Sequence, residues 1–278
     1  MKTVAIVGAG ETAAHLARSL AALEVAGEIR LIDSASNVAL GKALDIQQAG
    51  PIEGFDTRLY GAADPSAAAG AAVVVIADRH AAGPEPDGNA ELETVRRVAA
   101  AVPRAPLVFA GASHDSLLMR SVLELHVEPS RLVGSAPEAL ASAARSLLAL
   151  AAGVSPAQVS LPVFGVPGGW VFGWSEAVVA GRPAAVVLPP HDIAAVERRI
   201  RASWPPGPYA LGSAGARVTA GLLTRSRRRF TCFAALEGEW RRRAGAVSVA
   251  LGTNGISARE EPALSARERV QLATALAE

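Results

Sequence analysis

The chain begins with the apolar run Val4-Ala5-Ile6-Val7, which leads directly into Gly8-Ala9-Gly10-Glu11-Thr12-Ala13. The first run is typical of a buried strand, and the residues from Thr12 to about Leu23 have the spacing of a helix. A glycine turn between a buried strand and a helix presents the first helix amides to a diphosphate. The sequence therefore predicts a dinucleotide site at this turn.

Each position in this turn has a physical role. Gly8 permits the tight bend, Gly10 lets a diphosphate approach bare backbone, and Ala13 takes the small position where the helix packs on the strand. The amides of Glu11 and Thr12 open the helix and complete the predicted cofactor-binding positions. The alternative is that the two glycines only form a βα turn in an unrelated α/β domain.

A second apolar run, Ile29-Arg30-Leu31-Ile32, ends on Asp33, which lies 20 residues beyond Ala13. A carboxylate at this strand end accepts hydrogen bonds from a ribose diol and repels a 2′-phosphate. The sequence therefore favours NAD over NADP as the cofactor.

The composition limits the class of protein. The 278 residues allow one large domain or two modest ones, and the apolar runs are too short to span a bilayer. Without a signal-peptide pattern, we expect a soluble cytoplasmic protein with no membrane partner. The net charge of +1 argues against a nucleic-acid partner. A single cysteine, Cys232, excludes an internal disulfide, and no side-chain spacing suggests a metal site.

The first half alternates short β-rich runs with helix-period segments, which favours a parallel sheet with helical crossovers. Strands are expected at 3–7, 28–32, 57–60, 72–76, 106–109 and 131–133, and helices at 11–25, 38–49, 89–102 and 115–126. The fold class is therefore α/β, with a doubly wound Rossmann domain at residues 1–137. Ligands on such sheets bind beyond the carboxyl ends of the strands.

From residue 138 the pattern changes to a smaller α+β domain that extends to residue 278. Strands are expected at 169–174, 177–180, 230–236 and 246–251, and helices at 139–152, 190–203, 213–225 and 265–276. Ser265 and Glu268 have the spacing of a capping box at the start of the last helix.

Several stretches resemble the lactate/malate dehydrogenase family, especially the bacterial malate dehydrogenases. They lie in collinear order and cover most of the chain: Gly41 to Ala49, Pro51 to Asp56, Gly153 to Pro156, Ala177 to Pro183, Leu236 to Trp240 and Leu251 to Ile256. The resemblance implies a nicotinamide-dinucleotide domain joined to a substrate domain, and a homodimer or homotetramer.

The resemblance also implies a chemistry. A histidine oriented by an aspartate exchanges a proton with the substrate hydroxyl, hydride moves to C4 of nicotinamide, and arginines bind the substrate carboxylate. In this chain Pro167 stands at the histidine position, Leu140 at the aspartate, Ala143 at an arginine and Ala112 at an asparagine near the nicotinamide. The segment 81–88, which matches the family's arginine-bearing mobile loop, has no arginine and carries two acids.

Two further residues leave alternatives open. After the fourth strand, Ala77-Asp78-Arg79 replaces the family's Thr-Ala-Gly, so Arg79 either pairs with the diphosphate, fills the groove or has a simple surface role. His114, beside Asp115 at a strand's carboxyl end, is the best surrogate for proton transfer. The alternative for His114 is a satisfied loop or helix-cap residue.

Three functional hypotheses follow from this pattern. The first is a family member with a dinucleotide-binding fingerprint and a degenerate active site, which is not an ordinary malate or lactate dehydrogenase. The second is an active NAD-dependent oxidoreductase with relocated catalytic groups that acts on a hydroxy or oxo acid or a related substrate. The third is a structural partner in a mixed oligomer with an active relative.

Overall fold

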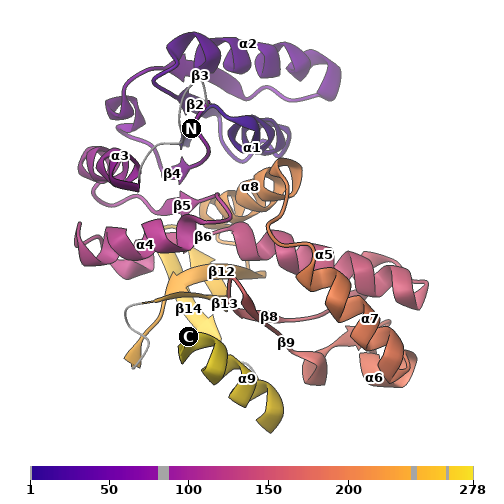
Figure 1. Ribbon diagram of the computed structural model, residues 1–278. Helices are drawn as coiled ribbons and strands as arrows, with labels where there is room; N and C mark the ends of the chain where they lie inside the picture. Colours follow the sequence, from indigo (N-terminus) through magenta and orange to yellow (C-terminus); the bar gives the residue numbers. More distant parts are fainter. Residues whose placement is uncertain (1, 81–87, 239–242, 261–262, 278) are drawn as a thin grey trace.

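The computed structural model describes residues 2–80, 88–238, 243–260 and 263–277. A long central sheet begins with six parallel strands in the order β3-β2-β1-β4-β5-β6, with helices on both faces (Figure 1). These strands are β1 (Thr3–Val7), β2 (Glu28–Ile32), β3 (Arg58–Ala62), β4 (Val73–Ile76), β5 (Leu107–Phe109) and β6 (Leu132–Gly134). All six lie within two residues of their expected positions, so the predicted Rossmann sheet is confirmed.

Successive side chains of each strand point to opposite faces of the sheet, and the interior is therefore divided into two cores. In β1, Val4 and Ile6 belong to one buried cluster, while Ala5 and Val7 belong to the cluster on the opposite face. Helices cover both faces, so the run from Val4 to Val7 is continuously apolar. The helices of this half are α1 (Glu11–Ala22), α2 (Ser36–Glu53), α3 (Gly88–Ala101) and α4 (His114–Leu123), with 3₁₀ turns η1 (Pro65–Ala68) and η2 (Pro129–Arg131).

The second half extends the same sheet with antiparallel strands. Phe233 of β12 (Arg229–Ala235) lies opposite Gly134 of β6, and the sheet continues through β13, β8 and β9. The added strands are β13 (Ala244–Gly252), β8 (Val163–Val166), β9 (Gly169–Phe172) and β14 (Gly255–Glu260), which pairs with β13. A separate small sheet contains β7 (Val159–Ser160), β10 (Val178–Val179) and β11 (Arg182–Pro183).

Five helices and two 3₁₀ turns complete the described part of this half. They are α5 (Ala136–Ala152), η3 (Pro156–Gln158), η4 (Trp174–Glu176), α6 (Ala184–Val187), α7 (Pro190–Arg201), α8 (Pro208–Thr224) and α9 (Ala266–Ala277). Helix α8 packs against α1, as Gly212 brings the two backbones into close contact. Cys232 is fully buried, as expected of a core residue. None of the helices in the described ranges has the length and apolar content that a bilayer crossing needs.

Some elements differ from the sequence-based expectation. Helix α8 begins at Pro208 rather than at 213, because proline is favoured in the first turn, where its missing N–H has no partner to lose. Helix α2 continues through Pro51 to Gly54, whose left-handed conformation ends it. Strand β8 was not expected, since Pro162 and Pro167 flank it closely.

Glu268 fixes the last helix to the rest of the fold. Its carboxylate accepts hydrogen bonds from the Ser265 amide at 2.8 Å and the Ser175 amide at 3.0 Å, which confirms the predicted capping box and adds a distant partner. Burial opposes ionisation, but the hydrogen bonds from Ser175 and Ser265 outweigh it and lower the pKa of Glu268 to about 2.

A pH-dependent contribution to stability follows. Because the folded pKa lies below the ordinary glutamate value of 4.5, this carboxylate's contribution is complete above about pH 4.5 and is lost as the pH falls toward 2. We expect Glu268→Gln to lower the free energy of unfolding by about 1–2 kcal/mol at pH 7 and to flatten the acid limb of its pH profile. Urea unfolding between pH 2 and 7 measures both effects. The exposed Glu237→Gln is the control, and an acid limb as steep as that of the unsubstituted chain would contradict the assignment.

Candidate functional site: the glycine turn and its surroundings

The predicted phosphate-binding turn folds as expected from its glycines. Gly8 has φ +122°, a conformation that disfavours any side chain, and its amide donates to the Ile32 carbonyl at 2.7 Å. The backbone of residue 78, which follows β4, lies directly against the turn. A Cβ placed on Gly8 would lie 2.3 Å from the Asp78 carbonyl oxygen, and one on Gly10 would lie 2.2 Å from Asp78 Oδ2.

The Asp78 carboxylate occupies the start of α1. Its Oδ2 accepts from the Thr12 amide at 3.0 Å and its Oδ1 from the Ala13 amide at 2.8 Å. The Gly10 amide donates to the Asp78 carbonyl at 2.9 Å. The chain's own acid therefore binds the amides that the sequence assigns to a diphosphate.

Asp33 lies at the end of β2, as expected of a ribose acceptor, and is only 4% exposed. Its Oδ2 accepts from the Ala9 amide and from the His80 amide, both at 2.9 Å. Its Oδ1 accepts from the Ala35 amide at 2.9 Å. Three backbone amides thus donate hydrogen bonds to the carboxylate that would accept from the ribose.

The remaining predicted cofactor residues lie around the same turn. Arg79 is exposed and its Nη2 donates to Ser34 Oγ at 2.7 Å, so its side chain crosses from the end of β4 to the end of β2. Glu11 pairs with Lys42 at 3.1 Å, and this hydrogen bond lowers the pKa of Glu11. The acids expected in the loop, Glu85 and Asp87, lie outside the described residues.

His114 is the first residue of α4 and its ring turns back toward the sheet. Its Nδ1 accepts from the Gly111 amide at 3.0 Å, and the Ile76 carbonyl is its second backbone partner. Burial lowers the pKa of His114 to about 4, although Asp78 and the Ile76 carbonyl oppose the shift. The imidazole is therefore neutral near pH 7 and engaged with the backbone. This is the contact pattern of the loop or helix-cap alternative.

Pro167 and Gly168 form the tight turn between β8 and β9, where Val166 pairs with Gly169. Gly168 has φ +89°, which suits the second corner of a type II turn after proline.

A hollow of about 700 Å³ lies beside this turn and is lined by Asp115, Arg120, Arg243 and Ala275, among others. Burial raises the pKa of Asp115. The side chains of the neighbours His114 and Asp115 therefore lie in different places: His114 contacts the backbone near the sheet, and Asp115 lines the hollow.

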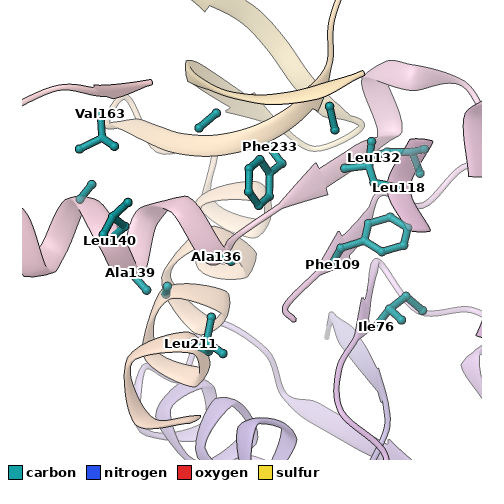
Figure 2. Packing of buried hydrophobic residues seen from close by; sticks show 14 of the residues in the cluster. Ile76, Phe109, Leu118, Leu132, Ala136, Ala139, Leu140, Val163, Leu211 and Phe233 are labelled. Atoms are coloured by element: carbon teal, nitrogen blue, oxygen red, sulfur yellow. The ribbon is translucent and has the colours of Figure 1, made fainter. Parts of the chain in front are cut away.

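Leu140 lies inside the core rather than at a cleft. It is fully buried on α5 in the same cluster as Val163 and Phe233 (Figure 2). The Trp170 ring of this cluster stacks on Phe233 at 6.0 Å and meets Trp204 at 4.6 Å between centroids. Leu140 therefore belongs to the same apolar cluster as Trp170 and Phe233.

The other two predicted positions are also apolar and close to the core. Ala112 is partly buried and packs against the same cluster, while Ala143 borders a hollow between α5 and α8. Neither residue offers a polar atom from its side chain. Pro167 borders the hollow beside the β8–β9 turn and Ala143 borders the one between α5 and α8, so these two positions line different hollows.

The structural roles of two acids, Glu138 and Asp78, were not predicted from the sequence. Glu138 is 4% exposed and accepts from Arg228 Nη2 at 2.6 Å, Arg145 Nη2 at 3.2 Å and the Thr231 amide at 2.9 Å. Asp78 lies in the stretch Ala77-Asp78-Arg79, in which the long cationic side chain of Arg79 is the more conspicuous feature. The signal in the sequence is an acid two residues after the strand that neighbours the glycine turn in a Rossmann sheet.

Comparison with known proteins places this geometry in a family. Residues 2–100 match the model of the lactate/malate dehydrogenase NAD-binding domain. A malate dehydrogenase from Thermomicrobium roseum is 30% identical over 212 residues, which cover 72% of this chain and 67% of that protein. The chain belongs to the lactate/malate dehydrogenase family.

Two further matches span nearly the whole chain. A malate dehydrogenase from Thioalkalivibrio sulfidiphilus is 28% identical over 297 residues, covering 100% of this chain and 97% of that protein. The structure of a lactate dehydrogenase from Cryptosporidium parvum in complex with lactic acid and NAD aligns with a TM-score of 0.91. That structure is 21% identical and covers 99% of this chain and 95% of its own. The predicted family and the predicted fold are both confirmed.

The cofactor prediction is confirmed as NAD, because residues 2–100 are an NAD-binding domain of this family. The residues of the site fit a dinucleotide in part. Gly8, Gly10, Ala13 and Asp33 all take the places that the fingerprint assigns to them in the strand-turn-helix unit. The amides at the start of α1, however, are bound by Asp78.

Proposed function

We propose that this protein keeps the NAD-binding scaffold of the lactate/malate dehydrogenases and lacks the groups for ordinary malate or lactate oxidation. The observation that carries the proposal is Leu140, which stands at the position of the orienting aspartate and is fully buried in an apolar core. A proton-transfer pair cannot form there, since Pro167, at the histidine position, has no titratable group. Positioned acid–base catalysis contributes about 10²- to 10⁴-fold to such reactions.

The groups that would hold NAD are the turn residues Gly8 and Gly10, the amides of Glu11, Thr12 and Ala13, and the Asp33 carboxylate. NAD, when bound, supplies a hydride acceptor at C4 of its nicotinamide. These residues bind and orient the dinucleotide, and none of them exchanges a proton with a substrate. Arg79, which contacts Ser34, lies beside the ribose acceptor and supports a covering role better than pairing with the diphosphate.

A second candidate is an oxidoreductase with relocated groups, and the hollow beside Pro167 favours it. Burial raises the pKa of Asp115 there, and Arg243 lines the same space, so a carboxyl group and a guanidinium border one cavity. His114 remains the other surrogate, although its nitrogens contact backbone groups. Either residue would act on a less anionic substrate than a dicarboxylate.

We also propose a cytoplasmic homodimer or homotetramer with a division into residues 1–137 and 138–278. The division is supported by the change from parallel to antiparallel pairing after β6. Self-association is supported by the outer face of α2, where Leu40 and Leu44 are 52% and 59% exposed. Large apolar side chains on a helix surface favour contact with another chain. A mixed oligomer with an active relative would use the same face.

The proposal is tested by pairing NADH titration calorimetry with a turnover assay on malate, lactate and a panel of 2-oxo acids. We expect NADH to bind and turnover to stay at the level of a no-enzyme blank. Turnover that Asp115→Asn or His114→Ala abolishes would establish the second candidate instead. Absence of NADH binding at millimolar concentrations would contradict the proposed cofactor role.

A further inference from the structure

We propose that Asp78 is an intramolecular competitor of NAD, and that segment 78–80 (Asp78, Arg79 and His80) closes the dinucleotide groove until it is displaced. The inference rests on the proposed NAD binding and names the residue that controls its strength. It is carried by two sets of contacts, one at the diphosphate end of the groove and one at the ribose end.

At the diphosphate end, the competition is for the same hydrogen atoms. The Thr12 and Ala13 amides lie in the first turn of α1, where an N–H has no partner within the helix. One Asp78 carboxylate binds both, with an oxygen on each amide at 3.0 and 2.8 Å. A carboxylate and a phosphate offer a helix N-terminus the same anionic oxygens. An amide that donates to Asp78 is therefore closed to a diphosphate.

The same segment also occupies the space beside the two glycines of the turn. The space beside Gly10, which a cofactor needs for its close approach, holds the Asp78 carboxylate, and the Asp78 carbonyl lies against Gly8. The Gly10 amide donates to that carbonyl at 2.9 Å. The backbone and side chain of Asp78 thus occupy both the space through which a diphosphate would approach and the amides that would donate to it.

At the ribose end, the next two residues complete the closure. The His80 amide donates to Asp33 Oδ2, the oxygen that also accepts from Ala9, so a ribose hydroxyl finds it already used. Arg79 reaches across to Ser34 Oγ at 2.7 Å. Displacing segment 78–80 would free the diphosphate amides and the Asp33 oxygen together.

The consequence is a reduced apparent affinity rather than a lost site. A ligand that binds only the open form has a dissociation constant raised by the inverse of the open fraction. The Asp78 charge adds to this effect when the segment is open, because it stays tethered close to the diphosphate and repels it.

The test is NADH titration calorimetry on the full chain with Asp78→Ala, and with Asp64→Ala as the matched control. Asp64 also caps an amide, that of Ser66 at 2.8 Å, but it precedes η1 and pairs with Arg97 rather than with α1. We expect Asp78→Ala to lower the NADH dissociation constant about tenfold or more, and Asp64→Ala to leave it within about twofold. ADP-ribose should show the same gain, because it carries the diphosphate and the adenosine ribose.

Each outcome decides the inference. Equal and measurable NADH affinities in the unsubstituted chain and Asp78→Ala would overturn it and leave NAD binding intact. Absence of binding in both would overturn the inference and the proposed cofactor role together. Asp78→Asn keeps the side-chain size and removes the charge, so it replaces Asp78→Ala if that variant does not fold. Amide exchange gives an independent readout, since protection of Thr12 and Ala13 in the free protein should disappear when the carboxylate is removed.

Discussion

Glu138→Ala is expected to lower the free energy of unfolding by about 3–4 kcal/mol, one of the two largest effects of a single substitution that the structure predicts. The carboxylate side chain is 6% exposed and joins three separate donors, two guanidinium groups and the Thr231 amide of β12. Removing it leaves Arg145 and Arg228 facing each other without their shared anion. It also leaves the partly buried Thr231 N–H unsatisfied.

Urea unfolding measures this loss, and two comparisons separate its causes. Glu138→Gln keeps an acceptor for the amide but no charge, so we expect about half of the loss, near 2 kcal/mol. Glu237→Ala removes a carboxylate that pairs with Arg259 but is 84% exposed, and should cost less than about 1 kcal/mol. A Glu138→Ala variant as stable as Glu237→Ala would show that the cluster does not hold α5 to β12.

The local part of this fold was predictable from the sequence, because it depends on periodicity and on turn chemistry. The run from Val4 to Val7 reads as a buried strand, Gly8 and Gly10 as a turn, and Ser265 with Glu268 as a helix cap. All three are present, and the six parallel strands follow from the same local patterns. The capping box, however, gave no sign of Ser175, which lies 93 residues earlier in the chain.

The site was harder to predict because its contacts are non-local. Asp78 reaches the turn only because β4 lies beside β1 in the sheet, a pairing between residues about 70 positions apart. From the sequence, Arg79 looked like the residue that would alter the groove, since it is long and cationic. In the structure the shorter acid beside it makes the decisive contacts. Glu138 likewise depends on Arg228, 90 residues away.

The position of segment 78–80 also makes a strong prediction for Gly8. We expect Gly8→Ala to lower the free energy of unfolding by about 3 kcal/mol in the absence of any nucleotide. Its φ of +122° lies beyond the left-handed helical region that alanine tolerates, and the new Cβ would lie 2.3 Å from the Asp78 carbonyl oxygen. Backbone on both sides of that contact has to move, because no flexible side chain can yield.

The matched substitution is Gly54→Ala at the end of α2, where φ is +80° and no atom lies within 4 Å of the added Cβ. It should cost only about 1 kcal/mol, the ordinary penalty for a left-handed alanine. Thermal and urea unfolding of the two variants, both without NADH, give the comparison. In a free protein with an open groove, the Asp78 carbonyl would not lie against Gly8, and the more distant Ala77 carbonyl oxygen, 2.9 Å from the added Cβ, would remain. Equal losses at Gly8 and Gly54 would therefore mean that residue 78 does not rest against the glycine turn in solution, whereas a larger loss at Gly8, to which its φ also contributes, is the result expected of the closed groove.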